Sequence, residues 1–199
     1  FPKNIGKRKD YNVKMKSRLK NIKDSFNGTS IRFSIFDKMG SLKYNVIVQH
    51  LPFIMNIDIY DLLGKKVAKI RQKNMLVLCS YNIHTKNKSF KINISLEHPD
   101  TDFKIKGLRW KFKGSVAQKA FSIVDLEDKV IMTQRADFFE RGKSYKLDII
   151  DEYNCIPCLC IALCIDTILI NDLKDALFFS ENKAIKKKSC ASNCSLEKN

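Results

Sequence analysis

Short segments in which apolar and polar residues alternate follow one another from about residue 11 to residue 150. Turn residues separate these segments. The pattern is typical of an all-β barrel or sandwich, because alternate side chains of a strand face opposite sides of its sheet. It predicts twelve strands, at residues 11–18, 30–36, 42–49, 53–60, 66–73, 77–84, 89–96, 102–106, 109–117, 119–125, 129–136 and 144–150.

A short repeat marks the ends of four predicted strands. In each copy an isoleucine is followed two residues later by Asp, and a turn residue stands three positions after the Asp. Asp at the start of a type I turn accepts hydrogen bonds from the backbone ahead of it, and Gly, Asp or Asn tolerates a left-handed backbone. We therefore expect four hairpin corners rather than an acidic metal site. The copies are Ile35, Asp37 and Gly40; Ile59, Asp61 and Gly64; Ile123, Asp125 and Asp128; and Ile149, Asp151 and Asn154.

The pattern changes after the fourth copy, because residues 155–170 are apolar except for Asp166 and Thr167. Pro157 suits the first turn of a helix, and Asp151 can accept hydrogen bonds from its free amides. A helix that is apolar on nearly every side must be surrounded by protein or lipid, and this run is shorter than the roughly 20 residues of a membrane span. The sequence predicts a closed antiparallel β-barrel of about twelve strands around a central hydrophobic C-terminal α-helix, with no transmembrane span. The residues predicted for its structural core are Trp110, Leu159, Leu163, Ile165 and Leu169.

The net charge of +16, from 37 Lys and Arg against 21 Asp and Glu, is far from ordinary. Such a charge favours anionic lipid surfaces, nucleic acids or acidic proteins as partners, although solubility and a general bias towards Lys are the alternative interpretation. Both ends of the chain are rich in Lys, with little apolar content to bury. We expect a basic arm at residues 1–10, one barrel domain at residues 11–180 and a disordered Lys-rich tail at residues 181–199.

The order of these parts resembles the LURP-one-related family, especially its bacterial-type members, within the Tubby C-terminal-like superfamily that also includes phospholipid scramblases. The resemblance implies a twelve-stranded barrel with a central C-terminal helix and no shared catalytic chemistry. Tubby-like domains bind phosphoinositides, so it also implies a non-enzymatic binding protein with anionic phospholipid as the first candidate ligand. The residues that carry the resemblance are Gly107, Leu108, Arg109, Trp110, Gly114, Asp151, Glu152, Ile165 and Asp166.

Residues 102–113 are predicted to form a hairpin with Gly107 in its turn. That register sets Lys106 opposite Arg109 and Lys104 opposite Lys111 on the solvent face, while the aromatic residues between them point to the core. Like charges paired across strands are destabilising, so folding alone does not favour this ladder. Protection of a sheet edge from aggregation is the alternative reason for it. The predicted ligand-binding residues are Lys104, Lys106, Arg109, Lys111 and Lys113.

Signatures of an enzyme are weak. His50, His84 and His98 are scattered, and we expect no catalytic residue, metal site or cofactor. Cys155 and Cys158 have the spacing of a redox pair at a helix start, so a thiol redox protein stays an alternative to simple core packing.

Partners other than lipid also stay open. One alternative is an adaptor or transcription-linked factor that binds protein or nucleic acid, although the sequence has no nucleic-acid-binding motif. Four of the seven Cys residues crowd into the apolar run, which predicts a reduced intracellular protein, cytoplasmic or peripheral to a membrane. Cys190 and Cys194 follow three lysines, an arrangement that fits either a lipid anchor or an incidental feature of the tail.

Overall fold

The computed structural model describes residues 9–14, 29–51, 54–75, 78–136 and 144–168. It contains twelve strands, a short 3₁₀ helix η1 (Glu152–Asn154) and an α-helix that begins at residue 155 and continues to at least residue 168. The strands are β1 (Lys9–Lys14), β2 (Thr29–Asp37), β3 (Leu42–Leu51), β4 (Ile54–Tyr60), β5 (Lys66–Met75), β6 (Leu78–Thr85), β7 (Ser89–Ser95), β8 (Phe103–Lys106), β9 (Trp110–Ser115), β10 (Ala120–Asp125), β11 (Val130–Ala136) and β12 (Ser144–Ile149).

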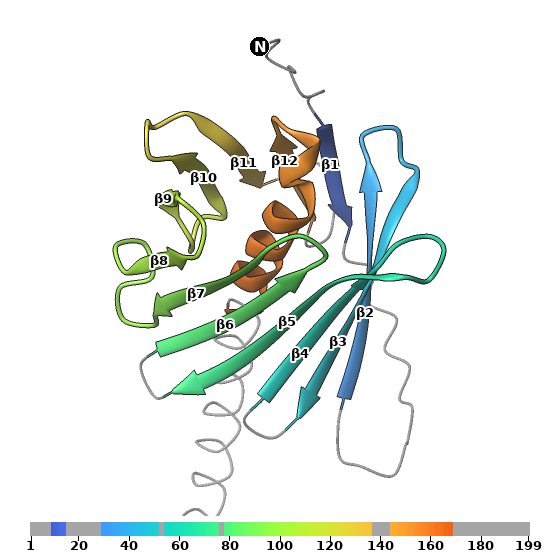
Figure 1. The fold of residues 1–199 in the computed structure, drawn as a ribbon, viewed down its shortest axis with the longest axis horizontal. Helices are drawn as coiled ribbons and strands as arrows, with labels where there is room; N and C mark the ends of the chain where they lie inside the picture. The colour runs from blue at the N-terminus through green and yellow to red at the C-terminus, as the bar shows by residue number, and fades with distance from the viewer. Residues whose placement is uncertain (1–8, 15–28, 52–53, 76–77, 137–143, 169–199) are drawn as a thin grey trace, which may run out of the picture. The chain divides into compact units, whose positions relative to one another are not determined.

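All twelve strands belong to one antiparallel sheet, in the order β8-β7-β6-β5-β4-β3-β2-β1-β12-β11-β10-β9 (Figure 1). The prediction of a mainly β protein with one C-terminal helix is confirmed. Closure into a barrel is not, because β8 and β9 stand at the two ends of this order and pair only with β7 and β10. The two edges meet through side chains instead, with the rings of Phe103 and Phe112 stacked at a centroid distance of 4.4 Å.

The Asp repeat forms three hairpin corners and one helix cap. Oδ1 of Asp37 accepts hydrogen bonds from two backbone amides ahead of it, and Asp61 and Asp125 do the same in their turns. Asp151, in the fourth copy, instead accepts from the amide of Tyr153 and caps η1. The prediction of a hairpin at this fourth copy is therefore wrong, because the chain enters a helix there.

One end of the sheet collects all of these turns. Neighbouring strands are antiparallel and even-numbered strands alternate with odd-numbered ones, so the six even strands run in the same direction and finish at the same end. We call this the turn end. It comprises residues 37–41, 61–65, 85–88, 106–110, 125–129 and 150–154.

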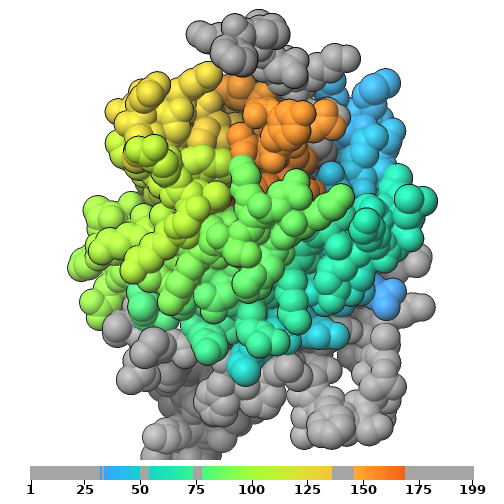
Figure 2. Space-filling model, viewed as in Figure 1, coloured from blue at the N-terminus to red at the C-terminus, as the bar shows by residue number. Residues whose placement is uncertain are grey.

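The contacts of Lys88 independently show that three of these segments lie at the same end of the sheet. Its Nζ donates a hydrogen bond to Oδ1 of Asn154 at 2.9 Å and lies 5.5 Å from the ring centroid of Trp110. The β6–β7 turn, the start of β9 and η1 therefore meet. Figures 1 and 2 show the β2–β3 turn in blue, the β10–β11 turn in yellow and the segment leading into the helix in orange, all in the upper part of the view.

The core lies between the inner face of the sheet and the helix. The isoleucine of each repeat copy is fully buried, and isoleucine recurs at the inward positions of β4 to β7. The chain divides into two compact units, Phe1–Leu163 and Cys164–Asn199. In the first unit the strands curve around the start of the helix (Figure 1), whose Leu159 and Leu163 are buried.

In the second unit the described residues are 164–168, all of them buried, including Ile165. Leu169 lies outside the described residues, as do most of the predicted arm, residues 1–8, and the whole of the predicted tail. Strand β1 begins at Lys9, two residues before the predicted domain start. No helix of the described residues is long and apolar enough to cross a membrane.

Replacing Leu163 with Ala is expected to lower the free energy of unfolding by about 2 to 5 kcal/mol, because it leaves a cavity where a large apolar side chain is buried. Chemical denaturation followed by circular dichroism measures this loss. A Leu163→Asp variant that kept a cooperative melt would contradict the buried helix.

Candidate functional site

The five basic residues predicted to bind a ligand fall into three groups. Lys104 and Lys106 lie on the exposed side of β8, and Lys111 and Lys113 lie on the exposed side of β9. Arg109 is exposed in the connection between the two strands. Because β8 and β9 are the two edges of the sheet, the predicted hairpin register is wrong. Lys106 is opposite Lys91 and Lys104 is opposite Asn93, while Lys111 faces Val124 and Lys113 faces Ser122.

Gly107 shows why the chain does not turn directly back after β8. Its φ of +93° is the positive value that the sequence predicted for a turn. A Cβ at this position would lie 3.1 Å from the carbonyl oxygen of Ser89 and 3.3 Å from Cα of Phe90. The backbone therefore packs against β7 before it crosses to the other edge.

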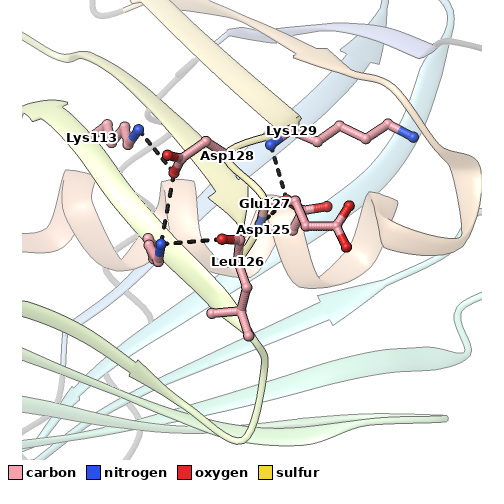
Figure 3. A network of polar contacts seen from close by, with 7 residues as sticks. Lys113, Asp125, Leu126, Glu127, Asp128 and Lys129 are labelled. Atoms are coloured by element: carbon pink, nitrogen blue, oxygen red, sulfur yellow. Dashed lines mark hydrogen bonds and ion pairs between the residues drawn. The ribbon is translucent and has the colours of Figure 1, made fainter.

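Lys111 and Lys113 are held by one carboxylate. Their Nζ atoms lie 3.8 Å and 3.0 Å from Oδ1 of Asp128, and Figure 3 shows Lys113 and Asp128 pointing toward each other. The hydrogen bond from Lys113, followed by the positive charges of both lysines, lowers the pKa of Asp128. This acid stays ionised and offsets part of the charge of β9, so β9 is the weaker half of the predicted site.

The other half extends into a continuous basic surface. Directly paired residues on neighbouring strands share a face of the sheet. Arg71 of β5 is opposite Asn82 of β6, Asn82 is opposite Lys91 of β7, and Lys91 is opposite Lys106 of β8. Lys69 and Lys73 lie on the same face of β5, two residues to either side of Arg71. We call this surface the basic face. Its cations are Lys69, Arg71, Lys73, Lys91, Lys104 and Lys106.

Acidic side chains are missing from the basic face. The other outward positions of β5 to β8 that the structure describes hold Ser, Asn, His, Val67 and Leu78, apart from Lys66 at the start of β5. The neighbouring strand β4 has Asp58, whose Oδ2 lies 2.8 Å from Nζ of Lys66. This hydrogen bond raises the pKa of Lys66 above its usual value. The same oxygen accepts from the hydroxyl of Tyr60, and Asp58 faces Lys69 across the two strands, so one carboxylate borders the six cations. The basic face thus keeps its positive charge.

Sequence reasoning missed Lys69, Arg71, Lys73 and Lys91. The sequence did indicate that these residues lie on the outward face of their strands. Basic residues occupy every second position from Lys69 to Lys73, and Lys91 stands at a polar position of an alternating segment. The sequence did not show which strands pair with each other.

Trp110 was predicted to lie in the core. The structure places it half-buried at the turn end.

The cysteines at the helix start do not form an exposed reactive pair. Cys155 and Cys158 are buried and unbridged. Burial, followed by the nearby Cys155 and Cys160, raises the pKa of the Cys158 thiol well above its usual value. A high thiol pKa disfavours the thiolate that redox chemistry needs. Within the described ranges no three His, Cys, Asp or Glu side chains are grouped as metal ligands.

A sequence model of the LURP-one-related family matches residues 11–166. The Bacillus subtilis (strain 168) protein YxjI is 27% identical over 165 residues, which cover 82% of this chain and 97% of that protein. A crystal structure of a protein from Arabidopsis thaliana is similar with a TM-score of 0.47 and 12% identity, and the match covers 84% of this chain and 92% of that one.

We expect native thiols to react slowly in a variant with Cys190 and Cys194 replaced by Ser. The five remaining cysteines are buried, and those with shifted pKa values stay protonated near neutral pH. Titration with a chromogenic disulfide reagent should detect them only after denaturation. Rapid labelling of the folded protein at neutral pH would instead support the redox alternative.

Proposed function

We propose that this chain, which belongs to the LURP-one-related family, is a non-enzymatic binding protein that associates with anionic phospholipid at a membrane surface. Membership of the family supports a binding protein in general. The lipid is our more specific proposal, and the basic face is its proposed contact surface. This places the protein at the periphery of a membrane rather than across it.

One observation carries the proposal: Lys91 and Lys106 lie directly opposite each other, in a row that also holds Arg71. Like charges at directly paired positions destabilise a sheet. No carboxylate among the described residues forms an ion pair with these three side chains. The fold therefore keeps a feature that costs stability, and an anionic partner supplies the missing counter-charge.

The aromatic residues favour lipid over single-stranded nucleic acid. Binding of unpaired bases combines cations with exposed aromatic rings on which the bases stack. Phe103 and Phe112 stack on each other, and Phe121 lies next to Phe112 with ring centroids 5.3 Å apart. Phe103 and Phe121 are buried, so these rings are used by the core. Among the described residues the basic face presents lysine, arginine and asparagine without an exposed Phe, Tyr or Trp, which suits phosphate groups of a surface.

That the chain catalyses no reaction remains part of the proposal. The raised pKa of Cys158 supports it, because it weakens the case for a redox pair. An acidic protein partner for the same basic face is the alternative.

Two paired substitutions test the proposed surface. Lys104→Gln with Lys106→Gln removes two charges from the basic face, and Lys111→Gln with Lys113→Gln removes two charges that Asp128 offsets in part. A lysine near an anionic membrane contributes about 1 kcal/mol. The first variant should therefore bind vesicles of phosphatidylserine and phosphatidylcholine about 30-fold more weakly, and the control variant should lose much less. Vesicle co-sedimentation measures both affinities.

The same assay distinguishes the alternatives. Equal losses in the two variants would mean that net charge alone drives binding and would contradict the proposed surface. Loss only on deletion of residues 1–8, which precede β1, would assign binding to the N-terminal arm. Binding to duplex DNA or single-stranded RNA at matched salt that exceeds binding to anionic vesicles would favour the nucleic-acid alternative.

A further inference from the structure

Large apolar side chains are exposed at the tips of the turn end. Met39 is 84% exposed, Leu62 and Leu63 are 59% and 93% exposed, and Tyr153 is 80% exposed. Leu126 and Ile150 are further exposed apolar residues at this end. Among the large apolar side chains that the described residues expose, Ile54 and Leu96 lie elsewhere on the sheet.

The turns themselves do not require these apolar residues. Asp61 accepts the amides of Leu63 and Lys65, and Gly64 adopts the positive φ of +76°. The side chains at the two positions between Asp61 and Gly64 are not needed to form the turn. Surface turns usually carry polar residues at such positions. The same holds for Met39, which lies between Asp37 and Gly40. The tips are thus apolar for a reason other than folding.

Basic residues surround the tips on one half of the sheet. The strands β2 to β8 are consecutive in the sheet, so their turns follow one another along the turn end. Lys65 follows Leu63, the β6–β7 turn exposes Lys86, and the β8–β9 connection exposes Arg109. The acidic Glu127 and Glu152 belong to the other half, at the β10–β11 turn and η1. The same half also carries the basic face, which shares Lys106 with the turn end.

We propose that this half of the turn end inserts into an anionic bilayer, with Met39, Leu62 and Leu63 entering the interfacial layer between lipid headgroups. Lys65, Lys86 and Arg109 contact the phosphates around them. This inference rests on the proposed function, because it assigns the orientation in which the protein meets the lipid. It adds a second set of contacts, which are apolar and do not involve the basic face.

The spacing of the tips favours a bilayer over a folded partner. Protein interfaces use contiguous apolar patches. Here the apolar residues stand on separate turns, with lysines and hydrogen-bonded backbone between them. A fluid interface can accept single apolar side chains at several points.

Tryptophan at a tip reports insertion directly. The chain has one Trp, at position 110, so a Trp110→Phe background makes an added Trp the single reporter. We expect Leu63→Trp in this background to shift its emission to shorter wavelength on vesicles of phosphatidylserine and phosphatidylcholine, and brominated lipid chains should quench it. Gln118→Trp is the matched control, because Gln118 is exposed in the β9–β10 turn at the opposite end of the sheet. Its emission should not change.

A second variant measures the contribution to affinity without a reporter. Leu62→Ser with Leu63→Ser should bind the same vesicles at least about tenfold more weakly, because two apolar side chains no longer leave water. Its melting temperature should equal that of the parent, since neither residue is buried. Unchanged affinity in this folded variant would overturn the proposal.

The outcomes separate the two proposals. Lys104→Gln with Lys106→Gln could weaken binding while the emission of Trp at position 63 stays, on added vesicles, at the wavelength it has in water. In that case the insertion is wrong and the proposed function stands. If Trp at position 63 shifts equally on vesicles of phosphatidylcholine alone, insertion remains and the role of charge fails. A shift that develops with protein concentration in the absence of vesicles would assign the tips to a contact between copies of the chain and overturn insertion.

Discussion

The structure depends on the burial of a helix that is apolar around its whole circumference. Such a helix cannot lie on one face of a flat sheet, because its other sides would remain in water. In the first unit the strands curve around the start of this helix, and their inward residues complete the core. Apart from Gln72, Ser80 and Gln134, the polar strand residues whose burial the structure describes are not buried, so they are not needed for packing and can carry charge.

A second consequence concerns the turns. Antiparallel pairing in a sheet of alternating even and odd strands places the ends of all even strands together. This arrangement brings exposed residues from six separate parts of the chain to one end, and the Asp repeat stabilises four of these segments. Lys88 joins three of these segments through Asn154 and Trp110. A surface with both apolar tips and lysines thus arises from strand direction alone.

The sequence allowed much of this to be predicted, because alternation identifies strands and the loss of alternation identifies the helix. The Asp repeat located three corners correctly, and its fourth copy was misread because the same Asp cap also starts a helix. The register of β8 and β9 could not be predicted. Adjacent strands joined by a short connection usually pair, but here Gly107 packs on β7 and each strand is paired on its other side. Arg71 and Lys91 became part of the candidate site only through cross-strand pairing, which depends on contacts distant in sequence.

The most direct test of the account is nuclear magnetic resonance of the protein on anionic vesicles or nanodiscs that contain lipid with spin-labelled headgroups. The account predicts that the label broadens amide signals in residues 37–41, 61–65, 85–88 and 106–110, together with Lys91 and its neighbours on the basic face. Signals from residues 116–119 and 96–102, at the opposite end of the sheet, should stay sharp. Broadening that is strongest at that opposite end, or uniform over the sheet, would contradict the proposed orientation and the surface on which it rests.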